Sequence, residues 1–294
     1  MRRNLKPMSQ IRRFPSISLA IPASFVTDTP HLREKTFRIG MIGRAAAIFR
    51  VDEIIIFRDI PKVDQSADTD LINSILSYME TPQYLRKHLF SFRENLKYVG
   101  ILPPLRTAHH PTLKHIRDLK LNEYREGVVM KVNKDGSYID VGVEETAFIG
   151  GQNLPLGKRV TVKITSLSQS FPEASQARRE EINIYWGYRV SVPNLTLGKI
   201  VKEELFDFTV LTSRRGKPFK EVIDEIKKKL KEANKVLVAF GSSNEGLREI
   251  LSKEGIEMNE VADMVINTIP LQGTETVRTE EAIYATLASL NLIN

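Results

Sequence analysis

The chain has 294 residues, of which 41% are hydrophobic and 27% charged, a balance typical of a globular protein with one or two cores. It contains no cysteine, which excludes disulfides, thiolate metal sites, iron–sulfur clusters and a cysteine nucleophile. No apolar run approaches the roughly 20 residues of a membrane span, and no apolar stretch of a secretory signal follows the basic N-terminus. We therefore expect a soluble, cytoplasmic protein.

The net charge of +7 favours a polyanionic partner, and RNA is the usual one. Basic side chains crowd the start of the chain at Arg2, Arg3, Lys6, Arg12 and Arg13. A second group, in residues 86–117, is interleaved with aromatic residues, a mixture that suits phosphate contact and base stacking. A solvated, Lys-rich surface is the alternative. The RNA-binding candidates taken from the two groups are Arg12, Arg13, Arg86, Arg106, His109 and His110.

The first part of the chain alternates predicted strands and helices. Apolar runs at residues 17–21 and 52–57 predict strands, the second of them fully buried. Apolar residues at helical spacing predict one helix over residues 31–49 and another over 71–79, the latter capped by Asp68 or Asp70. The order strand, helix, strand, helix predicts an α/β architecture.

The middle of the chain changes to short predicted strands separated by glycine-marked turns. The turn at residues 133–136 is a strong hairpin signal between two apolar stretches. The whole pattern predicts a small β-barrel, whose opening resembles OB-type RNA-binding barrels. A Pro-rich linker over 102–111 precedes it, and residues 166–175 are expected to form a mobile loop. The expected strands are 126–132, 137–142, 146–149, 159–164 and 184–190.

After the barrel the α/β alternation resumes, so the barrel interrupts one domain that closes from both ends of the chain. The predicted domains are a discontinuous α/β domain over residues 1–104 and 188–294, and an inserted barrel over 105–187. The expected strands in the last part are 208–211, 236–240 and 265–269, and the expected helices are 217–232, 245–252 and 279–290.

Two polar loops that carry glycine, at residues 241–247 and 271–277, each follow a predicted strand and precede a helix. α/β proteins hold small ligands at such loops, at the carboxyl ends of their strands. The glycine spacing does not fit a dinucleotide-binding site, and no Gly-Lys-Ser/Thr sequence indicates a P-loop. One shared ligand site is predicted, with ordinary turns as the alternative.

These loops resemble two signatures of the SPOUT methyltransferases: residues 240–247 the second and 267–277 the third, while 40–44 resembles the first. The resemblance extends to an archaeal and eukaryotic branch with an inserted OB-like domain, through residues 36–54, 81–86 and 102–110. It implies a SPOUT-type knotted parallel sheet with helices on both faces, a homodimer, and S-adenosylmethionine as the cofactor. Within this branch it implies methylation of ribosomal RNA, with uridine N3 favoured.

The resemblance also indicates the residues of the site. In-line transfer of the methyl group requires that the reactants be held in place, and loss of the uridine imide proton requires a base or a stabilising cation. The catalytic candidates are Arg44, Glu245 and Arg278, with Glu275 as a further carboxylate. The cofactor-binding candidates are Thr212, Gly241, Asn267, Ile269, Leu271, Gly273, Thr276 and Val277.

Each catalytic candidate has an alternative explanation. Arg44 could bind phosphate from a helix surface, and Glu245 could simply favour a helix N-terminus. No metal site is expected, because the five histidines lack zinc-ligand spacing. The alternative function is a non-catalytic RNA-binding or ribosome-assembly factor that retains the fold, and binding of S-adenosylmethionine distinguishes the two.

Overall fold

The computed structural model describes residues 11–167 and 171–293, so Arg2, Arg3 and Lys6 lie outside the described residues. The chain forms two compact units. One comprises residues 13–80, 94–104 and 188–293, and contains the α/β sheet. The other comprises residues 11–12, 81–93 and 105–187, and contains the barrel.

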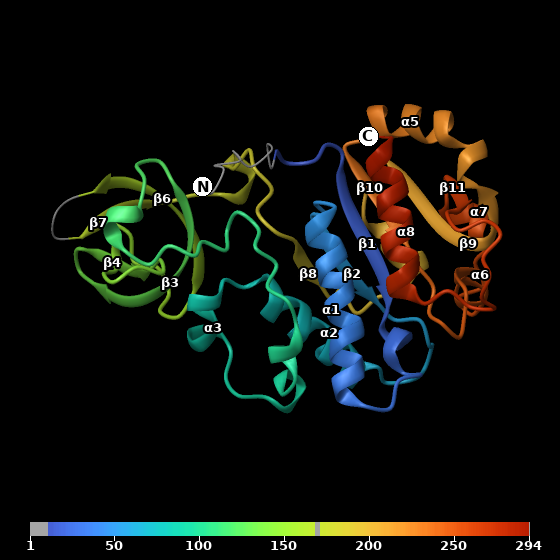
Figure 1. Cartoon of the computed structure of the whole chain (residues 1–294), viewed down its shortest axis with the longest axis horizontal. Coiled ribbons are helices and arrows are strands. Elements are labelled where there is room, and N and C mark those ends of the chain that lie inside the picture. Colours follow the sequence, from blue (N-terminus) through green and yellow to red (C-terminus); the bar gives the residue numbers. More distant parts are fainter. Residues whose placement is uncertain (1–10, 168–170, 294) are drawn as a thin grey trace, which may run out of the picture. The chain divides into compact units, whose positions relative to one another are not determined.

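The first unit is built on a six-stranded sheet in the order β11-β9-β10-β1-β2-β8 (Figure 1). All its strand pairs are parallel, which confirms the predicted α/β architecture. Its central strands are apolar runs because a parallel sheet is covered on both faces. The strands are β1 (Ser16–Pro22), β2 (Glu53–Phe57), β8 (Arg189–Ser191), β9 (Phe208–Pro218), β10 (Lys235–Ala239) and β11 (Met264–Asn267).

Helices cover both faces of this sheet. On one face, Ala20 and Leu237 belong to a buried cluster with residues of α4, α6 and α7. Side chains alternate along a strand, so Leu19 and Ile21 point to the other face, and both are fully buried. On that face α1 packs against α2 and α8 (Figure 1). The helices of this unit are α1 (Leu32–Ile48), α2 (Ser66–Glu80), α4 (Leu197–Glu203), α5 (Ile223–Glu232), α6 (Leu247–Ser252), α7 (Met258–Val261) and α8 (Thr279–Leu292), with 3-10 turns η1 (Ala23–Val26), η2 (Glu94–Leu96), η3 (Val99–Ile101) and η6 (Phe219–Glu221).

The second unit contains a closed barrel in the order β3-β4-β5-β7-β6. The predicted hairpin is confirmed: the Asn133 side chain accepts hydrogen bonds from the backbone of the turn, and Gly136 has φ 155°. Val129, Ile139 and Val162 lie in the barrel core. The elements of this unit are β3 (Tyr124–Asn133), β4 (Gly136–Asp140), β5 (Ala147–Gly150), β6 (Arg159–Leu167), β7 (Pro172–Gln176), α3 (Gln83–Leu89), η4 (Ile116–Asp118) and η5 (Arg179–Glu181).

Three predicted elements differ from the structure. The expected barrel strand over 184–190 is wrong, because only β8 is a named strand there, and it pairs with β2 in the parallel sheet. Tyr185 and Trp186 are buried aromatic residues of a connection, and their apolar character imitated a strand. Within the expected loop 166–175, β7 completes the barrel, while residues 168–170 lie outside the described residues. The helix expected from residue 217 begins later, because β9 continues to Pro218.

Candidate functional site

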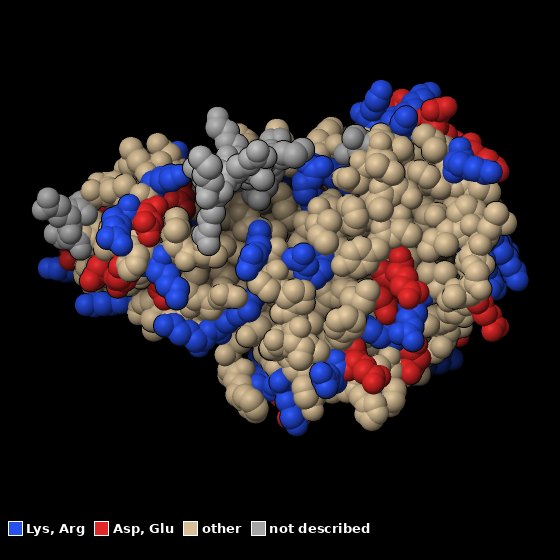
Figure 2. All heavy atoms as spheres, in the orientation of Figure 1, with Lys and Arg blue, Asp and Glu red and all other residues tan. Residues whose placement is uncertain are grey.

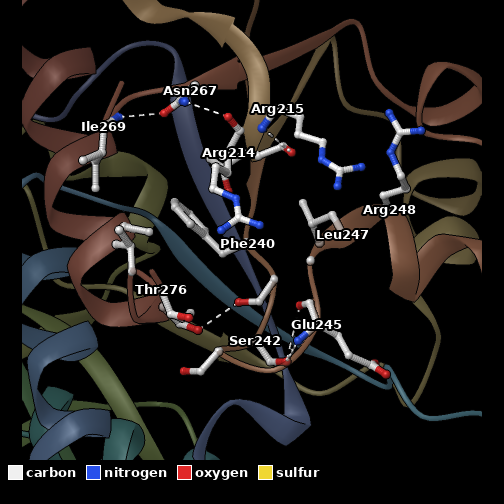
Figure 3. A pocket seen from close by; sticks show the side chains of 18 of the residues that line it. Arg214, Arg215, Phe240, Ser242, Glu245, Leu247, Arg248, Asn267, Ile269 and Thr276 are labelled. Carbon is white, nitrogen blue, oxygen red and sulfur yellow. Dashed lines mark hydrogen bonds between the residues drawn. The ribbon is translucent and has the colours of Figure 1, made fainter. Parts of the chain in front are cut away.

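A cavity of about 420 Å³ lies beside the middle of β9 and at the carboxyl ends of β10 and β11 (Figure 3). Its volume falls within the range of small-molecule sites in proteins. The loops after β10 and β11 form its walls, as predicted from the two glycine-bearing loops. The apolar part of the lining includes Phe240, Leu247, Ile266, Ile269 and Val277, and the polar part includes Thr212, Ser213, Asn267, Thr268 and Thr276.

The structure brings together most of the residues predicted to hold the cofactor. Leu271 and Gly273 are not among the lining residues. Leu271 is fully exposed and has φ 63°, so the loop turns outward there. What the others bind stays a prediction. The predicted residues that line the cavity are Thr212, Gly241, Asn267, Ile269, Thr276 and Val277.

Two of these side chains hold the walls in place. Thr212 donates a hydrogen bond from Oγ1 to the Ala239 carbonyl over 2.9 Å, which joins the middle of β9 to the end of β10. Asn267 donates from Nδ2 to the Arg214 carbonyl over 2.8 Å and accepts from the backbone N–H of Ile269 over 2.9 Å. Their polar atoms therefore shape the cavity.

The loop after β10 is a tight turn that requires glycine at its first position. A Cβ on Gly241 would lie 2.7 Å from the Glu245 carbonyl oxygen, closer than real Cβ atoms approach. Ser242 closes the turn, since its backbone N–H donates to that same carbonyl over 2.9 Å. Its hydroxyl accepts from the Glu245 N–H over 3.1 Å. The backbone of this loop is thus held close to the cavity.

The predicted catalytic residues do not meet within one chain. Glu245 lines the cavity, and its carboxylate forms an ion pair with Lys253. Arg44 is half-buried on α1, donates to the Pro104 carbonyl over 2.9 Å, and does not line the cavity. Arg278 caps α8, where its backbone N–H donates to Glu281, and it is likewise absent from the lining. Their catalytic roles stay predictions.

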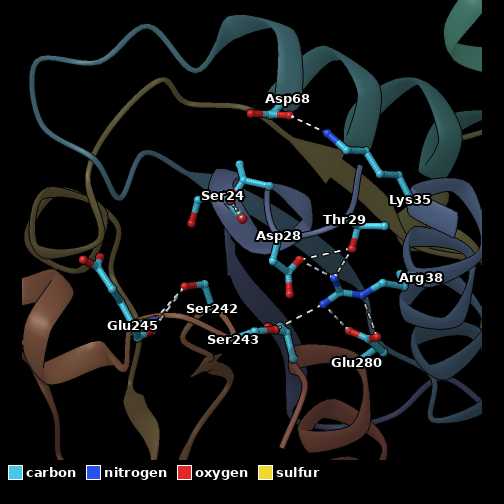
Figure 4. Close-up of polar contacts among 12 residues, drawn as sticks. Ser24, Asp28, Thr29, Lys35, Arg38, Asp68, Ser242, Ser243, Glu245 and Glu280 are labelled. Carbon is cyan, nitrogen blue, oxygen red and sulfur yellow. Dashed lines mark hydrogen bonds and ion pairs between the residues drawn. The ribbon is translucent and has the colours of Figure 1, made fainter. Parts of the chain in front are cut away.

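A polar cluster beside the cavity, centred on the buried side chain of Arg38, was not predicted (Figure 4). Arg38, 4% exposed, donates from Nε to Glu280 over 2.8 Å, from Nη1 to Asp28 over 2.5 Å and from Nη2 to Ser243 over 3.2 Å. Burial raises the pKa of Asp28, but hydrogen bonding to Arg38 and its charge outweigh this effect and lower the pKa below its usual value. Ser243 also lines the cavity, so the cluster supports its wall. No sequence spacing links these residues, because Arg38 and Glu280 meet only through folding.

The RNA-binding candidates separate into exposed and buried residues. Arg12 and Arg106 are exposed, and Arg86 and His110 are half-buried. His109 is fully buried. Arg13 is 3% exposed and donates to the carbonyls of Phe49 and Leu290. Burial and the nearby charge of Arg50 lower the pKa of Arg13 to about 10.

On the face drawn in Figure 2, the charged side chains do not form one continuous patch. Figure 2 shows Lys and Arg in several separate groups on the face in view, with Asp and Glu between some of them.

Across residues 11–167 and 171–293, no cluster of His, Asp and Glu is arranged to hold a metal ion. Within the same ranges, no helix has the length and apolar character needed to cross a membrane.

Comparison with known proteins shows a family that the sequence matches. The sequence matches, over residues 16–290, a family described as "Putative RNA methyltransferase". A 28S rRNA (uridine-N(3))-methyltransferase of Drosophila melanogaster is 33% identical over 94% of this chain, which spans only 61% of that protein. The protein of the same name from Homo sapiens is 31% identical over 94% of this chain and 77% of its own length. An uncharacterised protein of Halobacterium salinarum is 30% identical over 94% of this chain and 98% of its own.

Proposed function

This chain belongs to the family of RNA methyltransferases that it matches over residues 16–290, and on that premise we propose that it methylates uridine N3 in ribosomal RNA with S-adenosylmethionine. The observation that carries the proposal is the cavity beside the middle of β9 and at the carboxyl ends of β10 and β11. In α/β proteins, this edge of a parallel sheet is where ligands bind.

The residues of the cavity fit a nucleoside with an amino-acid tail. Phe240, Leu247 and Ile269 offer an apolar surface for a purine. The backbone at Gly241 approaches closely because no side chain stands there, and Thr276 adds a hydroxyl group. Leu271 and Gly273 do not line the cavity. They belong to the proposed site only as parts of the loop after β11, whose other residues line it. The bound cofactor would supply an electrophilic methyl group on a sulfonium.

With the cofactor bound, uridine N3 would take the methyl group from sulfur. The electron pair of the broken sulfur–carbon bond would stay on sulfur, and the imide proton would leave N3. Glu245 is one of the residues that line the cavity, and we assign to its carboxylate the acceptance of that proton. Arg44 and Arg278 lie outside the cavity of their own chain, so we reserve for them a role in the homodimer that the resemblance implies.

We propose that the barrel is an OB-like RNA-binding module. Its closed five-stranded order, with β5 and β7 as the parallel pair, supports this assignment. The rings of Tyr138 and Phe148 lie 5.1 Å apart, and those of Phe148 and Phe171 lie 6.1 Å apart. The Lys131 ammonium lies 5.6 Å from the Tyr138 ring centre. Aromatic rings beside a cation suit stacked bases and phosphate.

The proposed knot concerns the C-terminal part of the α/β unit. The resemblance implies that this part of the chain forms a deep trefoil knot around the cofactor. In support, α8 begins against the loop that follows β10, where Thr279 donates a hydrogen bond to Gly241.

We also propose that Arg12, Arg86, Arg106 and His110 contact RNA, while the burial of Arg13 and His109 argues against direct contact by either.

Two measurements test the function. Calorimetry with S-adenosylmethionine and S-adenosylhomocysteine should show binding of both to the full chain. Mass mapping of nucleosides in ribosomal RNA, before and after incubation with the protein and S-adenosylmethionine, should show a new N3-methyluridine. RNA binding without any cofactor binding would instead identify a non-catalytic assembly factor. Methylation at another atom would correct the target alone.

A further inference from the structure

Strand β9 carries a bulge at the mouth of the cavity. Leu211 pairs with Val265 of β11, but the next residue of β11, Ile266, pairs with Lys217. Residues 212–216 of β9 therefore have no paired residue in β11, and they include two consecutive arginines. Gly216 closes the bulge, where a Cβ would lie 2.5 Å from the Ile266 carbonyl carbon. A glycine is thus required for the chain to return to β11.

The bulge is fixed to both sides of the cavity. The Arg214 carbonyl accepts a hydrogen bond from the Asn267 side chain. The Arg214 guanidinium donates from Nη1 to the Glu275 carbonyl over 2.9 Å. The N–H of Arg215 donates to the Ser213 hydroxyl over 3.2 Å. The Arg214 guanidinium is thus committed to the loop after β11. The Arg215 side chain is left to act elsewhere.

Arg215 of β9 and Arg248 of α6 are both exposed cations beside the cavity. Both line the cofactor cavity, and both also line an adjoining cavity of about 490 Å³ that shares Ser213 with it. Figure 3 shows the two side chains on the same side of the cofactor cavity. Within the described part of the chain, neither guanidinium forms an ion pair or a hydrogen bond; Glu245, which also lines the cavity, is paired with Lys253.

We propose that Arg215 and Arg248 together bind a backbone phosphate of the RNA substrate at the mouth of the cofactor cavity. The planar fork of a guanidinium matches two phosphate oxygens, which makes Arg well suited to this contact. The adjoining cavity leads away from the loops that would hold the cofactor, so it offers room for a longer ligand. The site rests on the proposed function for the identity of its RNA. It would hold the target nucleotide beside the cofactor cavity.

Substitution of each arginine tests this site. Arg215→Gln and Arg248→Gln should each weaken binding of a fluorescein-labelled oligouridylate by about tenfold, the effect of losing one charge-assisted contact. Each should also reduce the salt dependence of binding by about one phosphate contact. Arg215→Lys should restore part of the affinity. Lys228→Gln, which removes an exposed cation on α5, is the matched control and should change neither quantity.

Calorimetry with S-adenosylhomocysteine separates this proposal from the proposed function. Unchanged cofactor affinity with weakened RNA binding supports the phosphate site. Loss of cofactor affinity in both arginine variants would overturn it, and would assign them to the carboxylate of the cofactor. RNA binding that is undetectable in the wild type, or unchanged in the variants, would overturn it as well. A wild-type chain that binds RNA through these arginines but binds no cofactor would reject only the proposed function.

Discussion

The Thr279 hydroxyl donates a hydrogen bond of 2.8 Å to the carbonyl oxygen of Gly241. Thr279 is the first residue of α8, and Gly241 is the second residue after β10, which ends at Ala239. The bond therefore joins the two loops that enclose the cavity. Thr279 is buried, so no water readily replaces its hydroxyl. The position of one loop thus depends on the other.

Removal of this hydroxyl should loosen the cavity. Thr279→Val keeps the shape of the side chain but leaves the Gly241 carbonyl without this donor, at a cost of about 1 kcal/mol. We expect affinity for S-adenosylhomocysteine, measured by calorimetry, to fall by about fivefold. Thr279→Ser keeps the hydroxyl and should bind almost as the wild type does. Equal affinities of the Val and Ser variants would show that the bond does not shape the site.

The two loops should respond differently to an added methyl group. Gly241→Ala places a Cβ 2.7 Å from the Glu245 carbonyl, so the turn must shift and cofactor binding should fall at least tenfold. Gly273→Ala is the matched control, because its Cβ would meet nothing within 4 Å. Calorimetry checks the affinity, and circular dichroism checks that both variants fold. Equal loss in both variants would contradict the assignment of the tight turn to the site.

Acid should destabilise the α/β unit through Asp28. Burial alone would raise the pKa of Asp28, but the hydrogen bond and the charge of Arg38, together with hydrogen bonds from Thr29 and Ser243, lower this pKa in the folded state. A carboxylate of this kind stabilises the fold above its unfolded pKa, near 3.8, and that stabilisation is lost as pH falls through the folded pKa. The free energy of unfolding in urea should therefore fall more steeply below about pH 4 in the wild type than in Asp28→Asn. Parallel pH profiles would show that Asp28 contributes nothing to the acid sensitivity.

The barrel unit should depend on Glu126, which is 4% exposed. Its carboxylate accepts from Arg159 over 2.7 Å, from Thr161 over 2.7 Å and from the Trp186 indole over 2.6 Å. Glu126→Ala leaves these donors without their acceptor and should lower the free energy of unfolding by about 3 kcal/mol. Glu126→Gln keeps an acceptor oxygen and should cost less.

Fluorescence measures the loss of stability in the Glu126 variants directly, because Trp186 is the single tryptophan of the chain. Urea unfolding followed at its emission should shift to lower urea in Glu126→Ala, by more than in Glu126→Gln. Coincident curves for the Ala variant and the wild type would show that the carboxylate does not hold this unit together.

Local sequence patterns are enough to predict most elements of both units. The apolar run over 17–21 and the helical stripe through Ile39 and Gly43 are buried as expected, because burial is what their periodicity reflects. The two glycine-bearing loops likewise indicate where the cavity lies, since each follows a strand and precedes a helix. These features depend on residues that lie close together in the sequence, so the sequence alone is enough to predict them.

Other features arise only when distant segments meet. The ion pair of Arg38 with Glu280 links residues 242 positions apart, and the buried place of His109 depends on its contact with Trp186. The bulge of β9 is likewise defined by its pairing with β11, since the arginines within it carry no signal of their position. The amino-acid pattern is therefore sufficient to locate the two loops. Folding decides which charged side chains surround the cavity, because hydrogen bonding and burial are settled by neighbours in space.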